Sequence, residues 1–229
     1  MKELEPAYYF ELAEFAHAKL FHDCQKVWEP LGQIKAYLQT LKLGLIEGTV
    51  SPQAYLIQPE LISIGKGTVV EAGAYIHGPC VIGENCVVRH GAYIRGNLVA
   101  GNQCVIGHDT EIKNAIFLNR AHAAHFAYLG DSILGNNVNL GAGTICANLK
   151  LRGDEVVVHC NGLRFPTGYR KFGAILGDGA QTGCNSVTNP GTILGKGAVC
   201  HPCTNFGGVI PPKAVVKTEA RVQICTPKH

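Results

Sequence analysis

Residues 64–117 read IGKGTV-VEAGAY-IHGPCV-IGENCV-VRHGAY-IRGNLV-AGNQCV-IGHDTE-IKNAIF, and an apolar residue opens every block of six. A period of six matches neither the 3.6 residues per turn of an α-helix nor the alternation of a flat β-strand. It matches a coil of three short strands with about eighteen residues per turn. The stretch therefore predicts a parallel β-helix, whose coils stack about 4.8 Å apart around one apolar interior.

Most blocks also carry a small residue four positions after the apolar one. These residues are Thr68, Ala74, Cys80, Cys86, Ala92, Leu98, Cys104 and Thr110. Both positions are predicted to point into the coil, and the frequent glycine after the apolar residue suits a tight corner. Repeats of this Ile-Gly-x-x-small-x kind resemble those of the left-handed β-helix transferases. The resemblance implies a left-handed coil, an exception to the right-handed crossover rule.

Length and composition favour one main domain with a sizeable core, because the 229 residues are 46% hydrophobic and include 28 glycines. The net charge of +3 is too small to favour a nucleic-acid partner. No apolar run approaches the roughly 20 residues that span a membrane, and the acidic start at residues 1–6 does not fit a signal peptide. We expect a soluble cytoplasmic protein without membrane or nucleic-acid partners.

The ten cysteines are interpreted as reduced residues rather than as a disulfide framework. Cys80, Cys86 and Cys104 fall on the small inward position, where a thiol acts as a compact hydrophobe. Cys200 and Cys203 have the CxxC spacing of a zinc or redox site, but no second pair stands at a distance that would complete four ligands. No metal is predicted.

Residues 1–45 are predicted to form a separate helical segment, and residues 46–229 the β-helix domain. Apolar residues at helical spacing predict a helix over 30–44; they are Leu31, Ile34, Leu38 and Leu41. A second helix is predicted over 10–21. We expect Trp28 to anchor the pair against the open end of the coil, as a cap over unpaired strand edges. A module that docks a partner is the alternative.

Beyond Leu118 the period is predicted to slip, because the next apolar positions shorten two steps to five residues. They are Ala124, Leu129, Leu134, Leu140 and Cys146. Regular blocks resume at Leu176. The charged stretch between them, 149–175, is predicted to be a loop thrown out from the coil, with a possible strand over 155–159. Long loops in compact folds are usually functional or disordered.

Three runs around this irregularity carry a more specific resemblance. They are His125-Phe-Ala-Tyr128-Leu-Gly-Asp131, then Asn139-Leu-Gly-Ala142-Gly-Thr-Ile-Cys-Ala-Asn148, and then Lys171-Phe172 with Ile175-Leu-Gly-Asp178. They resemble the acetyltransferase domain of bifunctional N-acetylglucosamine-1-phosphate uridyltransferases over roughly residues 65–216. The resemblance implies a homotrimer with sites between subunits. It also implies an acetyl-CoA-dependent N-acetyltransferase acting on glucosamine 1-phosphate or a related amino-sugar phosphate, as in UDP-N-acetylglucosamine biosynthesis.

The chemistry of that reaction needs a base, because the substrate ammonium must lose a proton before it attacks a thioester. Histidine side chains titrate near neutral pH and commonly fill this role. The resemblance places His125 at the position of the base. His122, read at a small inward position, is expected to be structural.

Arg95 and Lys113 stand eighteen residues apart, so they are predicted to lie on neighbouring coils about 4.8 Å apart. Two cations so close suggest a shared phosphate, although a solvated pair is the plainer alternative. The resemblance adds further residues on both substrates. For the sugar phosphate they are Tyr128, Asn139 and Lys171, and for acetyl-CoA they are the backbone of Ala142, the side chain of Asn148 and the position of Cys184.

Three positions on the donor side depart from the family pattern, namely Leu149, Cys184 and Pro202, whose ring nitrogen cannot donate. No Gly-rich loop of the Leu-Ala-x-Gly-x-Gly-Thr type is found, and 45 residues are too few for the nucleotide-binding half, so uridyl transfer is not expected. Another acyltransferase on a nucleotide sugar, of the lipid A type, and a non-catalytic trimeric scaffold remain alternatives. A zinc hydratase fits poorly.

Overall fold

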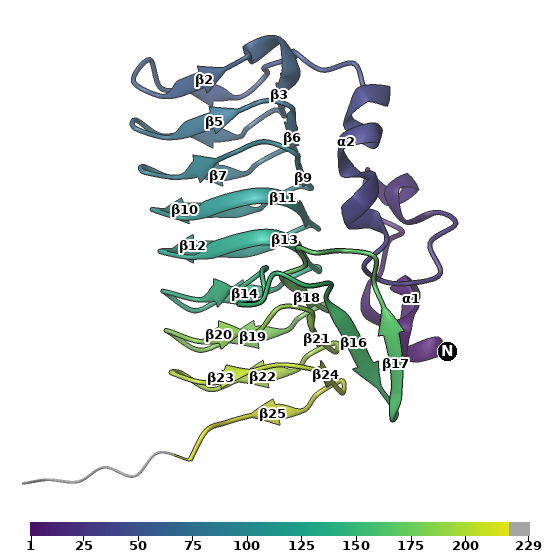
Figure 1. The fold of residues 1–229 in the computed structure, drawn as a ribbon. Coiled ribbons are helices and arrows are strands. Elements are labelled where there is room, and N and C mark those ends of the chain that lie inside the picture. The colour runs from purple at the N-terminus through teal and green to yellow at the C-terminus, as the bar shows by residue number, and fades with distance from the viewer. Residues whose placement is uncertain (220–229) are drawn as a thin grey trace, which may run out of the picture.

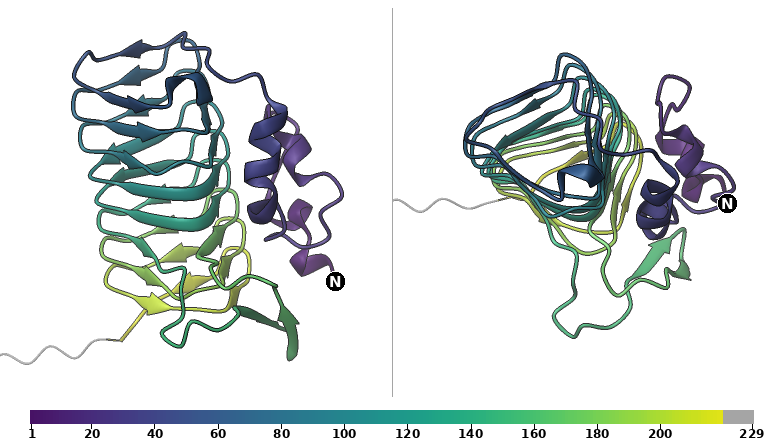
Figure 2. Two further views of the ribbon diagram at one scale, coloured as in Figure 1. Left: turned by 45° about the horizontal axis from the view of Figure 1, so that its top comes forward. Right: turned by 90° about the horizontal axis from the view of Figure 1, so that it is seen from above.

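The computed structural model describes residues 1–219, and residues 220–229 of the predicted β-helix domain lie outside it. Short strands stack into three faces of parallel strands, and the coil is triangular when viewed along its axis (Figures 1 and 2). The chain runs from the first face to the second and third and winds left-handed as it descends (Figures 1 and 2). The predicted fold class, a left-handed parallel β-helix with N-terminal helices, is confirmed.

The strands of each face follow one another at coil intervals. The first face contains β1 (Thr49–Val50), β4 (Val69–Val70), β7 (Val87–Val88), β10 (Val105–His108), β12 (His122–His125), β14 (Asn139–Leu140), β19 (Gln181–Thr182), β22 (Val199–Cys200) and β25 (Val215–Val216). The second contains β2 (Tyr55–Ile57), β5 (Tyr75–His77), β8 (Tyr93–Ile94), the first halves of β11 (Glu111–Phe117) and β13 (Tyr128–Leu134), β15 (Ile145–Cys146), β20 (Val187–Thr188) and β23 (Asn205–Phe206). The third contains β3 (Ile62–Ile64), β6 (Cys80–Ile82), β9 (Leu98–Ala100), the second halves of β11 and β13, β18 (Ala174–Leu176), β21 (Thr192–Leu194) and β24 (Val209–Ile210).

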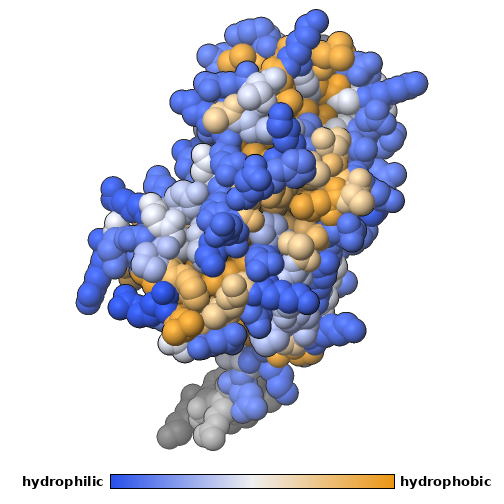
Figure 3. Space-filling view, turned by 90° about the vertical axis from the view of Figure 1, so that its right-hand side faces the viewer, coloured by the Kyte–Doolittle hydropathy of each residue, from blue (hydrophilic) through white to orange (hydrophobic). Residues whose placement is uncertain are grey.

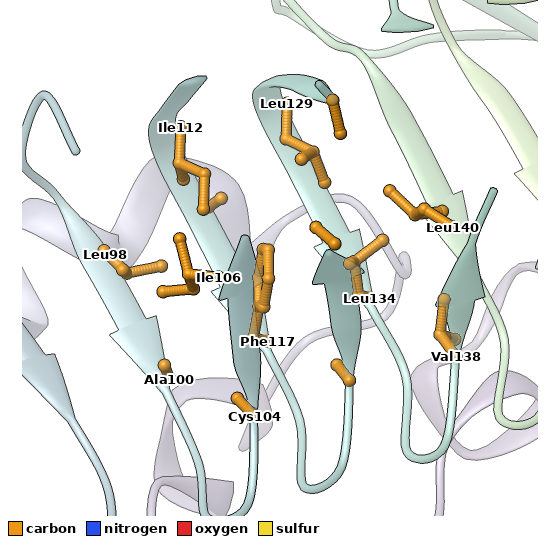
Figure 4. Close-up of a cluster of buried hydrophobic side chains, with 14 of the residues drawn as sticks. Leu98, Ala100, Cys104, Ile106, Ile112, Phe117, Leu129, Leu134, Val138 and Leu140 are labelled. Atoms are coloured by element: carbon orange, nitrogen blue, oxygen red, sulfur yellow. The ribbon is translucent and has the colours of Figure 1, made fainter. Parts of the chain in front are cut away.

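The interior is one column of apolar side chains that point inward from all three faces (Figure 4). Cys80, Cys86 and Cys104 are buried in it, as predicted. Burial raises the pKa of the Cys80 thiol to about 12, so this side chain stays protonated and behaves as a hydrophobe. The two cysteines of the CxxC sequence lie in different environments: Cys200 is buried in the core, and Cys203 is exposed.

The first slip of the repeat lies two steps earlier than predicted. The inward residues run through Ile112, Phe117, Ala123, Leu129 and Leu134, so the five-residue steps lie at 112–117 and 129–134. The prediction that Leu118 and Ala124 point inward is therefore wrong, and the step from 129 to 134 is the one that was placed correctly.

The error has a physical cause at Leu118, which is fully buried but outside the coil, among the residues that pack beneath the N-terminal helices. Apolar side chains therefore occur on both sides of the third face, and the alternation that reveals the inward side disappears there. One consequence is that His122 is half-buried on the outer side of β12, between the inward residues Ala121 and Ala123, and not at an inward position.

The N-terminal layer, defined as residues 1–43, lies against the third face and not over the open end of the coil (Figure 2). It contains η1 (Lys2–Leu4), α1 (Pro6–Tyr9), η2 (Ala18–Phe21) and α2 (Pro30–Thr40); a further short turn, η3 (Pro59–Leu61), belongs to the coil. The predicted helix over 10–21 is limited to η2 at its end. The predicted cap position is wrong for Trp28, whose ring packs 6.3 Å from that of Phe172 at the side wall.

The loop excursion, residues 149–175, folds back onto the side of the molecule that carries the N-terminal layer. Its strands β16 (Val157–Cys160) and β17 (Leu163–Pro166) form an antiparallel hairpin, and β16 overlaps the strand predicted over 155–159. Val156 and Val158 pack into the apolar cluster beneath the N-terminal layer. Layer and hairpin together cover the third face, and their outer surface is largely hydrophilic (Figure 3). Within residues 1–219 no further helix or hairpin packs on the first and second faces.

A row of amide side chains fastens residues 9–14 to the corner between the third and first faces. Asn119 and Asn136 donate through Nδ2 to the carbonyl oxygens of Glu14 and Glu11, at 3.0 and 2.8 Å. Asp178 accepts the backbone N–H of Glu11 at 2.7 Å, and burial raises the pKa of its carboxyl. None of the helices in residues 1–219 is long and apolar enough to cross a membrane.

We expect acid to weaken the N-terminal layer through His17, whose Nδ1 lies 2.9 Å from Tyr37 Oη. Burial lowers the pKa of His17 from its ordinary value of 6.5. The unfolded chain therefore binds this proton more readily, and stability falls as the pH drops below about 6.5. The His17→Gln variant should lose less melting temperature than the wild type between about pH 7.5 and 5.5. The exposed His22→Gln variant is the control, and equal losses in all three proteins would contradict the assignment.

Candidate functional site

The two predicted phosphate-binding cations lie side by side at one edge of the second face. Arg95 directly follows β8, and Lys113 lies in β11. The pairing of Ile94 with Ile112 places the two cations at the same position of neighbouring coils. Both side chains are partly open to solvent, with 42% of Arg95 and 30% of Lys113 exposed.

Each cation has an acidic neighbour of its own. Arg95 Nη1 donates to Glu111 Oε1 at 2.7 Å, and Lys113 Nζ lies 3.3 Å from Asp131 Oδ1. These carboxylates offset the repulsion between the two cations, so the pair does not require a phosphate for its stability. A phosphate that binds here would have to compete with at least one of the ion pairs.

Tyr128 and Asn148 continue this edge toward the next coil. Tyr128 Oη donates to Asn148 Oδ1 at 3.4 Å, and Asn148 Nδ2 donates to Asp131 Oδ2 at 2.6 Å. Burial raises the pKa of Tyr128, and the charges of Glu111 and Asp131 raise it further, so its hydroxyl remains a neutral donor. Gly130 lies between these side chains, and a Cβ atom there would collide with Asn148 Nδ2, which explains the glycine.

Lys171 joins the same edge at the base of the excursion. It forms an isolated bridge with Leu149, and the next residue, Phe172, donates its N–H to the carbonyl of Asn148 at 2.9 Å. The Lys171 side chain is exposed. The second-face cluster is thus defined by five residues: Arg95, Lys113, Tyr128, Asn148 and Lys171.

A second group, here called the corner row, lies where the first face turns into the second. It contains His125, Ala142 and Cys184, one from each of three successive coils. Gly143 donates its N–H to the carbonyl of His125 at 3.1 Å, and Asn185 donates to that of Ala142 at 2.8 Å. His125 and Cys184 are exposed. The corner row therefore places the predicted base in line with two of the predicted donor-side positions.

Asn139 lies on the outer side of the first face, one coil beyond His122 and in register with it. Its side chain is exposed. Within one chain Asn139 neighbours the corner row, three positions before Ala142 and at the first-face side of the turn. It is therefore separated from the second-face cluster.

The corner row and the second-face cluster border opposite edges of the same face. Lys113 pairs with Gly130, which follows His125 by five residues, and five extended residues span at most about 17 Å. The imidazole and the two cations thus flank one wall of the coil instead of facing unrelated directions.

Two acidic residues of this wall were not assigned a role from the sequence. Glu111 and Asp131 were overlooked, although Asp131 ends the first motif run. Asp131 follows Lys113 by eighteen residues, the length of one regular coil, and this spacing was the available signal, although the coil here is one residue shorter and pairs Lys113 with Gly130.

Comparison with known proteins agrees with the motif resemblance. The family described as the GMPPB C-terminal domain matches residues 76–163. Among solved structures, the Arabidopsis UDP-N-acetylglucosamine acyltransferase is 16% identical, with a TM-score of 0.42 over 76% of this chain and 71% of that one. The acetyltransferase domain of PglB from Neisseria gonorrhoeae, solved with acetyl coenzyme A, is 17% identical, with a TM-score of 0.32 over 82% and 64% of the two chains.

Curated relatives match over a shorter stretch. A bifunctional sugar-1-phosphate nucleotidylyltransferase/acetyltransferase of Sulfurisphaera tokodaii is 38% identical over 92 residues, 40% of this chain and 23% of that protein. The bifunctional protein GlmU of Bacillus cytotoxicus is 32% identical over 111 residues, 48% of this chain and 20% of the relative. The chain thus spans about a fifth of the length of these relatives. The predicted resemblance to bifunctional sugar-phosphate nucleotidylyltransferase/acetyltransferases is confirmed.

Proposed function

We propose that this chain is an acyltransferase that transfers the acetyl group of acetyl-CoA to the amine of an amino-sugar phosphate, glucosamine 1-phosphate being the first candidate. The observation that supports it is the wall between the corner row and the second-face cluster, with two cations at one edge and an imidazole at the other. An amino-sugar phosphate has matching ends, an anion and an amine. The name of the Sulfurisphaera tokodaii relative, which includes acetyltransferase, supports the same reaction class.

The second-face cluster would bind the phosphate. The Arg95 guanidinium offers a fork of N–H donors, Lys113 offers a point charge, and the neutral Tyr128 hydroxyl adds a hydrogen bond. Lys171 lies at the same edge and adds a further positive charge. The sugar would then extend across the face toward His125, where Asn139 could contact its hydroxyl groups.

The corner row would bind the donor and carry the chemistry. His125 accepts a proton from the substrate ammonium, and the free amine attacks the thioester carbonyl carbon. The new C–N bond forms as the C–S bond breaks; the attacking nitrogen then releases its second proton to solvent, and the proton held by His125 passes to the leaving thiolate of CoA. The backbone at Ala142 and the surface at Cys184 would hold the acetyl-CoA chain along this corner, and Asn148 keeps the Tyr128 hydroxyl in place.

A homotrimer would complete this site. The N-terminal layer and the hairpin cover the third face, so only the first and second faces are free for contacts between copies. Both faces expose apolar side chains, among them Val69 on the first and Tyr55 and Tyr93 on the second. Such patches mark protein–protein contacts. Packing the first face of one copy against the second face of the next would close the open wall into a cleft.

The proposal is tested by incubating the purified chain with acetyl-CoA and glucosamine 1-phosphate and measuring release of free thiol. Thiol release that depends on the sugar phosphate, with an N-acetylated product seen by mass spectrometry, is the expected result. Glucosamine without phosphate is the matched control and should react far more slowly. Binding of both ligands without product would instead support the non-catalytic scaffold.

Alanine at Arg95 or Lys113 should raise the KM for the sugar phosphate at least about tenfold, because a charge-assisted hydrogen bond contributes roughly 1.5–3 kcal/mol. The KM for acetyl-CoA should change little. Lys66→Ala, which removes an exposed lysine from a corner of an early coil, is the control. If the sugar-phosphate KM is unchanged in both Arg95→Ala and Lys113→Ala, the phosphate does not bind at this edge.

One observation favours a larger acyl donor as the second candidate. Next to Asn148 an open groove of about 610 Å³ is lined by Ala147, Leu149, Leu151 and Pro190, among other residues. Leu149 is 42% exposed and stands where the resembling family usually has tyrosine. The groove could accept an acyl chain longer than acetyl. Competition between acetyl-CoA and acyl carrier protein loaded with a longer chain distinguishes the two donors.

A further inference from the structure

We propose that Asp131 is the positioning residue that holds Lys113 and Asn148 at fixed places on the wall. This inference rests on the proposed function, because it assigns Asp131 a part in binding the sugar phosphate. Asp131 itself is not expected to touch substrate. Its carboxylate lies behind the phosphate-binding cation, and only 8% of its side chain is exposed.

The contacts of the carboxylate are numerous and come from three directions. Lys113 Nζ donates to Oδ1 and Oδ2 at 3.3 and 3.4 Å, and Asn114 Nδ2 donates to Oδ1 at 3.0 Å. Asn148 Nδ2 donates to Oδ2 at 2.6 Å. The backbone carbonyl of Asp131 accepts the N–H of Gly173 at 2.9 Å. Asp131 thus connects the preceding coil to Asn148 through its carboxylate and to the end of the excursion through its backbone carbonyl.

This arrangement decides where the ammonium group of Lys113 can lie. A free lysine side chain samples many rotamers, and fixing it upon binding costs conformational entropy. Asp131 fixes the Lys113 side chain before any phosphate arrives, so less of that entropy remains to be lost. The buried carboxylate in turn needs the lysine, because an unpaired charge in this position would be strongly unfavourable.

Asp131 also connects the second-face cluster with the N-terminal layer. Through Asn148 it reaches the Tyr128 hydroxyl, and through Asn114 it reaches the N-terminal layer, since Asn114 Nδ2 also lies 3.3 Å from the carbonyl of Leu31. The phosphate-binding edge and the N-terminal layer therefore share one anchor. A change at Asp131 should move both Lys113 and Asn148, whereas loss of either partner alone leaves the other in place.

The sequence supplies a matched control in Asp178. Both aspartates end a Leu-Gly-Asp run, at residues 129–131 and 176–178. The carboxylate of Asp178 also accepts several hydrogen bonds, but from Asn136 and from the N–H of Glu11 at the opposite corner of the coil. None of the proposed site residues contacts it. Asp178→Asn therefore reproduces the loss of a structural carboxylate without touching the site.

The experiment compares steady-state kinetics of the wild type, Asp131→Asn and Asp178→Asn with acetyl-CoA and glucosamine 1-phosphate. For Asp131→Asn we expect a KM for the sugar phosphate at least tenfold higher, a lower kcat and a KM for acetyl-CoA within twofold of the wild type. Asp178→Asn should leave all three constants unchanged. In a Lys113→Ala background, Asp131→Asn should raise the sugar-phosphate KM by no more than twofold, because its effect acts through that lysine.

The inference alone would be overturned if the wild type is active and Asp131→Asn leaves the sugar-phosphate KM unchanged. The same holds if the effects of Asp131→Asn and Lys113→Ala on that KM are fully additive. A wild type without turnover would overturn the proposed function and this inference with it. Should Asp131→Asn fail to fold, Asn114→Ala replaces it, because it removes one donor to the carboxylate and leaves all charges in place. Asn114→Ala is then expected to raise the same KM severalfold, and an unchanged value would contradict the positioning role.

Discussion

Replacing His125 with alanine is expected to lower kcat for N-acetylation by roughly 100- to 10,000-fold, the usual contribution of a general base. The substrate amine would then have to lose its proton to water instead of to a positioned imidazole. The KM for the sugar phosphate should stay within severalfold of the wild type, because the cations that bind the phosphate lie at the other edge of the face. Thiol-release kinetics at saturating concentrations of both substrates measure the effect.

The coil supplies a control for this variant in His90, which occupies the same kind of corner two coils earlier. His90 is exposed, and its ring stacks at 5.8 Å on that of His108, whose register partner is His125. His90→Ala thus removes a corner imidazole without touching the corner row and should retain full activity. Equal rates in His125→Ala and the wild type would show that another group is the base.

The relation between sequence and fold was clearest where only one side of a strand is buried. Ile76, Ile82 and Ile94 alternate with exposed or half-exposed neighbours, so the six-residue period revealed the interior directly. On the third face Ile116 and Ile133 point outward yet are fully buried beneath the N-terminal layer. Their burial depends on segments far away in the sequence, and no local period could reveal it.

The position of the N-terminal layer depended on the same long-range information. Helical spacing predicted α2 well, but an amphipathic helix packs equally well on an open end or on a side wall. The side wall is the better partner here because outward apolar residues such as Val99 and Ile175 create a surface that needs cover. The repeat marks these residues as outward, because they stand next to the inward positions Ala100 and Leu176, but it does not show which outer wall the helices cover.

For the candidate site too, the sequence predicted positions correctly in the regular part of the repeat and less well beyond the slip. Arg95 and Lys113 lie in the regular part of the repeat, so a spacing of eighteen residues placed them correctly on neighbouring coils. His122 lies just beyond the slip and was assigned to the wrong side of its strand. Asp131 also lies beyond it, and it contacts Lys113 although the shifted register pairs Lys113 with Gly130.

Deleting residues 1–43 is expected to make the protein aggregate, because the deletion uncovers the outward apolar side chains of the third face. These side chains belong to Val81, Val99, Ile116, Leu118, Ile133, Ile175, Ile193 and Val209. Each fully buried aliphatic side chain contributes roughly 1.5–3 kcal/mol. The combined loss is comparable with the roughly 5–15 kcal/mol that stabilise a typical domain. The soluble fraction after expression and the melting temperature measure the effect.

A second deletion variant separates the two interpretations of the layer. It also carries Val99→Thr, Ile116→Thr and Ile133→Thr, which make the uncovered wall more polar while keeping β-branched side chains in its strands. If the layer only covers the wall, this variant should regain solubility, assemble as the full chain does and keep part of its activity. Soluble protein that has lost its assembly would instead make residues 1–43 a docking module. Full solubility of the simple deletion would contradict the argument, because an apolar wall of this size does not stay exposed in a stable monomer.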